Sequence, residues 1–117
     1  MAWRPLPTEG SVRYPGTFTA TRYGVSYEGQ ALGCGSGVYR TDDTAILAAP
    51  PDLYGEWPCG TKLRVVNLLT GGFIEVYRLD SCPGCGNNHI DLSEAGISQL
   101  CGWSCDIITG LEVYILQ

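Results

Sequence analysis

Apolar and polar residues alternate along several short stretches of the chain, a period of two that is typical of strands with one buried face. The first stretch covers residues 17–23. Two more, residues 62–68 and 73–79, flank Thr70-Gly71-Gly72 and predict a hairpin with a short glycine turn. Residues 111–116 form the last alternating stretch. The pattern therefore predicts an all-β protein.

Two further segments are less regular. The apolar run at residues 44–49 suits either a short helix or a buried strand, and Pro50-Pro51 ends it in both cases. A short extended stretch at residues 89–92 precedes Ser93 and Glu94, which favour a short helix over residues 93–100 with Ser93 as its cap. Five or six strands with one or two short helices indicate a small β-barrel.

The start of the chain has a different character. Residues 1–15 hold three prolines and two arginines without a clear period, so we expect a linker or an arm on the surface. The barrel domain is then expected over residues 16–117. Because no long apolar stretch follows Met1, we interpret Met1 as an added start on a mature fragment.

Composition narrows the possible partners. The 117 residues suffice for one domain, and 16 Gly and 7 Pro favour a turn-rich β fold over a helical bundle. A net charge of −5 with only 7 Lys and Arg disfavours nucleic acid and anionic membrane surfaces. No apolar run approaches the roughly 20 residues of a membrane span. We expect a soluble monomer.

The cysteines are the most informative residues in the composition. An even number in a short chain with few lysines predicts a secreted domain held by three disulfides. The CPGC and CGWSC segments are close to zinc-knuckle spacing, but the second has one residue too many and two cysteines would stay unexplained. A thioredoxin-like redox role for the CPGC segment needs a strand-to-helix context in a parallel sheet, which the pattern of this sequence does not offer. We therefore expect no metal and no cofactor. The six cysteines are Cys34, Cys59, Cys82, Cys85, Cys101 and Cys105.

Several short motifs, in their order along the chain, resemble the double-psi β-barrel proteins. This group includes rare-lipoprotein-A-like domains, the first domain of expansins, single-domain loosenins, barwin, family-45 endoglucanases and barwin-like protease inhibitors. The resemblance covers roughly residues 16–117 and implies a six-stranded double-psi β-barrel. The motifs are Thr21-Arg22-Tyr23-Gly24, Gly33-Cys34-Gly35, Cys59-Gly60-Thr61, Asp80 and His89-Ile90-Asp91-Leu92-Ser93.

The resemblance also bears on disulfide pairing. In the expansin pattern the cysteine at the Cys34 position pairs with the one at the Cys59 position, and we carry this pair over. For the other four, sequence proximity favours Cys82 with Cys85 and Cys101 with Cys105, without fixing either pair.

Asp91 is the residue through which the resemblance bears on catalysis and glycan binding. Glycoside hydrolysis needs two carboxyl groups, and Asp91 matches the acid of the family-45 endoglucanases. Their second carboxylate falls at Val25, so the hydrolytic base is missing. Expansins show the same loss, and in them aspartates at the positions of Asp91 and Asp80 line a glycan groove. The resemblance thus implies non-hydrolytic binding or loosening of cell-wall polysaccharide, with cellulose, chitin and peptidoglycan as candidates.

Other side chains are candidates for the same groove. His89 lies two residues before Asp91, so both project to one face of an extended segment and could share a proton network. Thr21 matches a groove threonine in the expansin pattern. Beside glycine- and proline-rich loops, we expect Tyr23, Tyr27 and Trp57 to be partly exposed and to stack on sugar rings.

Each candidate also has a purely structural interpretation. Asp91 could cap the helix after Ser93, and Asp80 could satisfy backbone groups of the loop that follows it. His89 could be a surface or packing residue, and Thr21 an ordinary strand residue. Tyr54 and Trp103 could also belong to a stacking surface for sugar rings, but some of these five aromatic side chains must belong to the core of a small barrel.

Two other functions remain open. A barwin-like inhibitor of cysteine proteases would act through loops, and the loop at residues 82–88 permits this. A lytic transglycosylase could work with Asp91 alone, because the sugar's own hydroxyl attacks. Similar enzymes carry a histidine after the run at residues 45–49, where this chain has Pro50. We therefore expect a binding protein rather than an enzyme.

Overall fold

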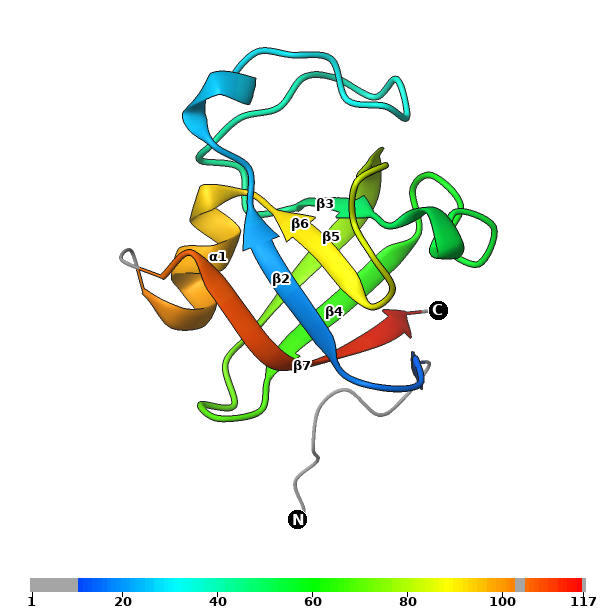
Figure 1. The fold of residues 1–117 in the computed structure, drawn as a ribbon, viewed down its shortest axis with the longest axis vertical. Helices are drawn as coiled ribbons and strands as arrows, with labels where there is room; N and C mark the ends of the chain where they lie inside the picture. The colour runs from blue at the N-terminus through cyan, green and yellow to red at the C-terminus, as the bar shows by residue number, and fades with distance from the viewer. Residues whose placement is uncertain (1–10, 103–104, 117) are drawn as a thin grey trace.

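Six strands close into a barrel in the computed structural model, which describes residues 11–102 and 105–116 (Figure 1). The sheet runs β7-β2-β6-β3-β5-β4, and pairing of β4 with β7 returns it to its start. This confirms the predicted all-β class and six-stranded barrel. The barrel strands are β2 (Phe18–Arg22), β3 (Ile46–Ala49), β4 (Lys62–Asn67), β5 (Phe73–Ser81), β6 (His89–Leu92) and β7 (Ile107–Leu116).

Parallel pairing determines which side chains meet. β2 runs parallel to β6 and β3 runs parallel to β5, whereas β6 and β3 are antiparallel. The connections at residues 23–45 and 82–88 are long because they join strands that are not neighbours in the sheet, β2 to β3 and β5 to β6. β6 is thereby inserted between β2 and β3, and Asp91 stands opposite Thr21 on one side and Ala48 on the other.

The ambiguous apolar run is a strand, β3, and all four of its residues are buried. Leu47 and Ala49 face the main core inside the barrel. Ile46 and Ala48 face a second apolar cluster under the 23–45 connection, with Tyr23, Leu32 and Tyr39. Since both faces are covered, β3 has no polar face and its sequence does not alternate.

The predicted hairpin and helix are confirmed. β4 and β5 pair antiparallel across the glycine turn. Helix α1 (Glu94–Cys101) begins after Ser93, whose Oγ accepts a hydrogen bond from the Gly96 N–H at 3.0 Å. Two short 3-10 turns, η1 (Val25–Tyr27) and η2 (Pro51–Leu53), complete the elements. No helix in the described ranges is long and apolar enough to cross a membrane.

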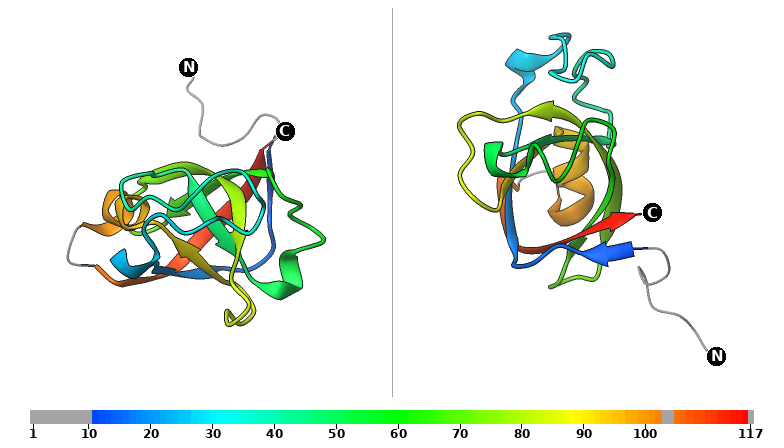
Figure 2. Two further views of the ribbon diagram at one scale, coloured as in Figure 1. Left: turned by 90° about the horizontal axis from the view of Figure 1, so that it is seen from above. Right: turned by 90° about the vertical axis from the view of Figure 1, so that its right-hand side faces the viewer.

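The start of the chain contains one strand that the sequence pattern does not reveal. β1 (Ser11–Arg13) pairs antiparallel with the end of β7, outside the closed barrel (Figure 2). Arg13 Nε also donates to Glu112 at 2.8 Å. Three residues are too few to show a period, which is why this segment resembled an arm. Residues 1–10 of the predicted arm lie outside the described ranges, and the boundary at residue 16 stays a prediction.

Two of the three aromatic residues expected to be exposed are buried. Trp57 is 0% exposed, with its ring packed at centroid distances of 5.5 Å from Tyr14 and 5.6 Å from Phe18. Tyr23 is 7% exposed and stacks on Tyr39 at 4.3 Å. Tyr27, at 48%, is exposed as predicted. Proximity to a glycine- or proline-rich loop was a poor guide because the loops fold back over these rings. Trp103 lies outside the described residues.

Three disulfides form: Cys34–Cys59, the pair that the resemblance implied, and Cys82–Cys85 and Cys101–Cys105, which sequence proximity favoured without fixing them. The first joins the 23–45 connection to the segment before β4. The other two disulfides close short loops. The two segments with spacing close to that of zinc knuckles, CPGC and CGWSC, therefore each hold an internal disulfide.

Removing the long-range disulfide should destabilise the fold more than removing a short one. Cys34 and Cys59 are 25 residues apart, and the Cys34→Ala/Cys59→Ala variant should lose about 3 kcal/mol in the chain-entropy account. For Cys101→Ala/Cys105→Ala, with a separation of 4, the same account gives about 2 kcal/mol. Urea unfolding of both variants measures the difference. An equal loss would contradict the expectation.

Candidate functional site

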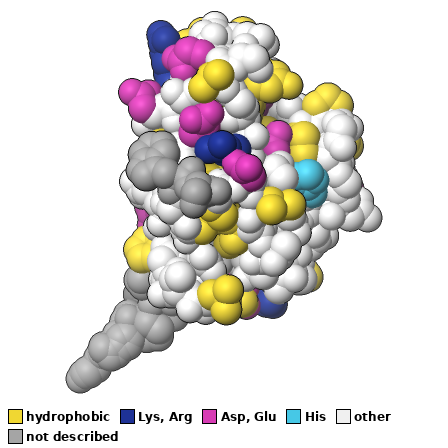
Figure 3. All heavy atoms as spheres, turned by 60° about the vertical axis from the view of Figure 1, so that its left-hand side comes forward, with side chains coloured by type: hydrophobic (Ala, Val, Ile, Leu, Met, Phe, Trp, Pro, Cys, Tyr) yellow, Lys and Arg dark blue, Asp and Glu magenta, His cyan; other side chains and the backbone are white. Residues whose placement is uncertain are grey.

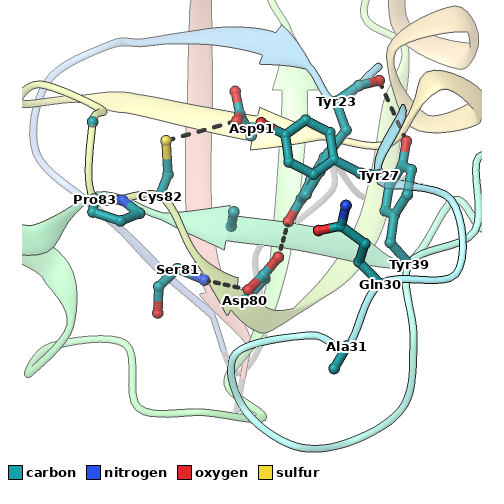
Figure 4. A pocket seen from close by; sticks show the side chains of 12 residues that line it. Tyr23, Tyr27, Gln30, Ala31, Tyr39, Asp80, Ser81, Cys82, Pro83 and Asp91 are labelled. Atoms are coloured by element: carbon teal, nitrogen blue, oxygen red, sulfur yellow. Dashed lines mark hydrogen bonds between the residues drawn. The ribbon is translucent and has the colours of Figure 1, made fainter. Parts of the chain in front are cut away.

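A pocket of about 400 Å³ lies between the 23–45 connection and the ends of three barrel strands (Figure 4). Ala48 of β3 stands between two aspartates, opposite Asp80 of β5 and opposite Asp91 of β6. Its small side chain leaves space between the two carboxylates. The lining residues are Tyr23, Tyr27, Gln30, Ala31, Tyr39, Ala48, Asp80, Ser81, Cys82, Pro83, Gly84 and Asp91.

Asp91 is one of the two site acids that the sequence predicted, and it is partly buried. Its side chain is 24% exposed, and burial raises the pKa of the carboxyl above its ordinary value. A hydrogen bond from Thr21 Oγ1 to Oδ1 and the charge of His89 act in the opposite direction. Cys82 Sγ lies 3.6 Å from Oδ2, but a disulfide sulfur has no proton to donate, so this is a packing contact.

Thr21 connects His89 to Asp91. His89 Nε2 lies 2.8 Å from Thr21 Oγ1 and 4.0 Å from Asp91 Oδ1. A hydroxyl has one proton, so a threonine that donates to Asp91 must accept from the Nε2–H of His89. The predicted proximity of His89 and Asp91 is therefore realised through Thr21. His89 is not among the pocket-lining residues, and Figure 3 shows the single histidine side chain at the surface.

Asp80 is held by three donors. Its Oδ1 accepts from the Gly33 N–H at 2.6 Å and from the Ser81 N–H at 2.9 Å, and its Oδ2 accepts from the Tyr23 hydroxyl at 2.8 Å. A Cβ on Gly33 would lie 2.8 Å from Oδ1, so only glycine permits this approach. Burial, followed by the hydrogen bond to Asp80, strongly raises the pKa of Tyr23, which keeps the hydroxyl a donor. Asp80 thus fastens the 23–45 connection to β5.

These contacts bear on the structural interpretation of each acid. Asp80 does satisfy the backbone of Ser81, as its structural interpretation required, and it lines the pocket as well. Asp91 does not cap α1, because the cap is the Ser93 side chain. Val25, at the place of the hydrolytic base, is 69% exposed and is not part of the lining.

Two features of the site escaped the sequence analysis. Arg78 is buried beneath the rim at 6% exposure, where Nε donates to the Asp80 carbonyl at 3.0 Å and Nη2 donates to Ser81 Oγ at 2.8 Å. The sequence did contain a signal for the burial of Arg78, because residue 78 continues the alternation of inward-facing positions in β5 after Ile74 and Val76. Gln30 and Tyr39 come from the irregular connection and carried no such signal.

The elevated pKa of Asp91 should shape the dependence of stability on pH. The folded chain binds this proton more tightly than the unfolded chain does. Its stabilising contribution is therefore complete below the ordinary carboxyl pKa and is lost as pH rises through the raised value. Asp91→Asn should flatten this part of the curve. Thr21→Val removes a hydrogen bond that lowers the pKa and should raise it further. An NMR titration giving Asp91 an ordinary or lowered pKa would contradict this expectation.

Comparison with known proteins identifies the fold. No family model and no curated protein sequence matches the chain. Among solved structures, Streptomyces papain inhibitor superposes with a TM-score of 0.68 at 23% identity, covering 95% of this chain and 99% of that one.

An expansin is similar to the chain as well. The apo expansin of Clavibacter michiganensis superposes with a TM-score of 0.66 at 28% identity over 86% of this chain. A mutant of that expansin in complex with cellohexaose gives 0.65 at 24% over 92%. The chain spans about half of the expansin, 49% and 50% in the two structures. Its closed mixed barrel and these structural neighbours show that the chain has the double-psi β-barrel fold.

Proposed function

We propose that the pocket binds a neutral cell-wall polysaccharide without cleaving it, which narrows the cell-wall polysaccharide expected from the sequence to an uncharged one. The observation that carries the proposal is the paired placement of Asp80 and Asp91 across Ala48, in a pocket that opens beside an exposed tyrosine. The similar expansin that was solved in complex with cellohexaose supports a glucan as the ligand. Sugar hydroxyls can donate hydrogen bonds to both carboxylates.

The lining suits a neutral chain. Tyr27 is 48% exposed and its ring meets Tyr23 edge-on at 5.8 Å, so one face is free to stack on a pyranose ring. Gln30 adds an amide to the same wall. Among the described lining residues there is no lysine or arginine, so a uronic acid would place its carboxylate beside Asp80 and Asp91 without a compensating cation.

The geometry argues against hydrolysis. A second carboxylate would have to activate water or attack carbon. Val25 has none, and both oxygens of Asp80 already accept hydrogen bonds from Gly33, Ser81 and Tyr23. Asp91 therefore serves as the central polar contact for the glycan, and Asp80 lines the same pocket. We also infer secretion, since three disulfides are typical of oxidising compartments.

Binding should fall when either the acid or the ring is removed. In pull-downs, cellulose and chitin should retain less of the Asp91→Asn and Tyr27→Ala variants than of the parent chain. Loss of one strong contact should raise Kd roughly tenfold. Pectin serves as the anionic control and should retain little of the parent chain. Neither reducing nor anhydro-ended sugars should be released. Hydrolysis at an endoglucanase rate, or full binding by both variants, would refute the proposal.

A second candidate is inhibition of a cysteine protease. It is favoured by the similarity to the Streptomyces papain inhibitor, whose chain is covered over 99% of its length, against about half for the expansin. Inhibition would use a surface other than the pocket.

The two candidates respond differently to one substitution. If the chain inhibits papain, Asp91→Asn should leave the inhibition constant unchanged while it weakens retention on cellulose. A papain assay and a cellulose pull-down on the same two proteins measure both. Parallel loss in both assays would mean that the protease and the glycan compete for the pocket.

A further inference from the structure

The tip of the β4–β5 hairpin presents apolar side chains to solvent. Leu69 is 93% exposed, more than any other exposed large hydrophobic side chain in the described residues. Leu68 and Phe73 beside it are 52% and 41% exposed. We refer to residues 68–73 as the apolar tip. A fully exposed leucine contributes nothing to the core, and clustered exposed apolar side chains commonly mark an interaction site.

The turn that carries the apolar tip is held by several hydrogen bonds. Asn67, 3% exposed, donates from Nδ2 to the Leu100 carbonyl of α1 at 2.8 Å and accepts from the Leu69 N–H at 3.0 Å. The Gly71 N–H donates to the Asn67 carbonyl at 2.7 Å, and Gly71 adopts a φ of 78°. These hydrogen bonds favour one conformation of the tip before any partner binds, which would lower the entropy lost on binding.

The apolar tip is well separated from the pocket. In Figures 1 and 2 the β4–β5 turn lies at the opposite end of the barrel from the 23–45 connection. The loop at residues 82–88, which the sequence analysis associated with inhibition, instead borders the pocket through Cys82, Pro83 and Gly84. None of the exposed large hydrophobic side chains belongs to that loop.

We propose that the apolar tip enters the substrate cleft of a papain-like cysteine protease, with Leu69 in an apolar side-chain pocket of the enzyme. The proposal rests on the second candidate function above and names the surface that would perform it. A two-stranded hairpin end is narrow enough to enter a cleft, and Gly71 and Gly72 add no side chains behind the leucine. A lipid surface is the less favoured partner, because the chain carries a net charge of −5.

One variant and one matched control test this assignment. Leu69→Ser removes the exposed leucine without adding charge. Ile107→Ser does the same at a 57% exposed position on β7. Papain inhibition constants are measured for both and for the parent chain, with urea unfolding to verify that each variant folds. We expect Leu69→Ser to weaken inhibition at least about tenfold, since burial of a leucine side chain is worth that factor or more. Ile107→Ser should be unchanged.

The other outcomes are distinct. If the parent chain inhibits papain and Leu69→Ser inhibits equally well, the apolar tip is not the docking element, although the inhibitor function stands. Equal weakening by Leu69→Ser and Ile107→Ser would overturn the assignment in the same way. If the parent chain does not inhibit papain at all, this proposal and the inhibitor candidate both fail, and glycan binding is unaffected. Retention on phosphatidylcholine vesicles that Leu69→Ser abolishes would assign the tip to membranes instead.

Discussion

Backbone hydrogen bonding of β6 to strands on both of its sides is the constraint on which the site depends. Its parallel register with β2 sets Asp91 opposite Thr21, and its antiparallel register with β3 sets Asp91 opposite Ala48. The barrel is closed by β4 and β7, so β6 has no free edge along which to shift. A slip of one residue would turn Asp91 to the other face and bury it in the barrel core.

The two aspartates of the pocket have different environments and therefore different tasks. Asp80 accepts hydrogen bonds from Tyr23, Gly33 and Ser81, and it holds the long connection over the pocket. Asp91 accepts one bond from Thr21, and its burial raises its pKa. Such a division between a carboxylate with three donors and a partly buried one with a single donor is compatible with the proposed glycan site, in which Asp91 is the central polar contact. It is less suited to hydrolysis, in which both carboxyl groups must react.

The barrel separates two surfaces with little in common. The pocket end combines carboxylates with an exposed tyrosine, a composition suited to sugars. The hairpin end presents Leu69 from a turn fixed by Asn67. The structural neighbours, an expansin and a papain inhibitor, illustrate that one fold serves partners of different chemistry.

Local patterns in the sequence determined much of the fold. Alternation specified β2, the β4–β5 hairpin and β7, and Ser93 specified the start of α1. These elements follow from periodicity and capping, which act within a few residues. The His89–Asp91 proximity was local in the same sense.

Only the tertiary structure decided what depends on distant residues. It showed that the run at 44–49 is a strand, because two apolar clusters cover its two faces. It also showed that Trp57, Tyr23 and Arg78 are buried. The hydrogen bond from the Gly33 N–H to the Asp80 carboxylate likewise depends on the tertiary structure. Burial and solvation are set by the packing of segments far apart along the chain, so no local pattern could have given them.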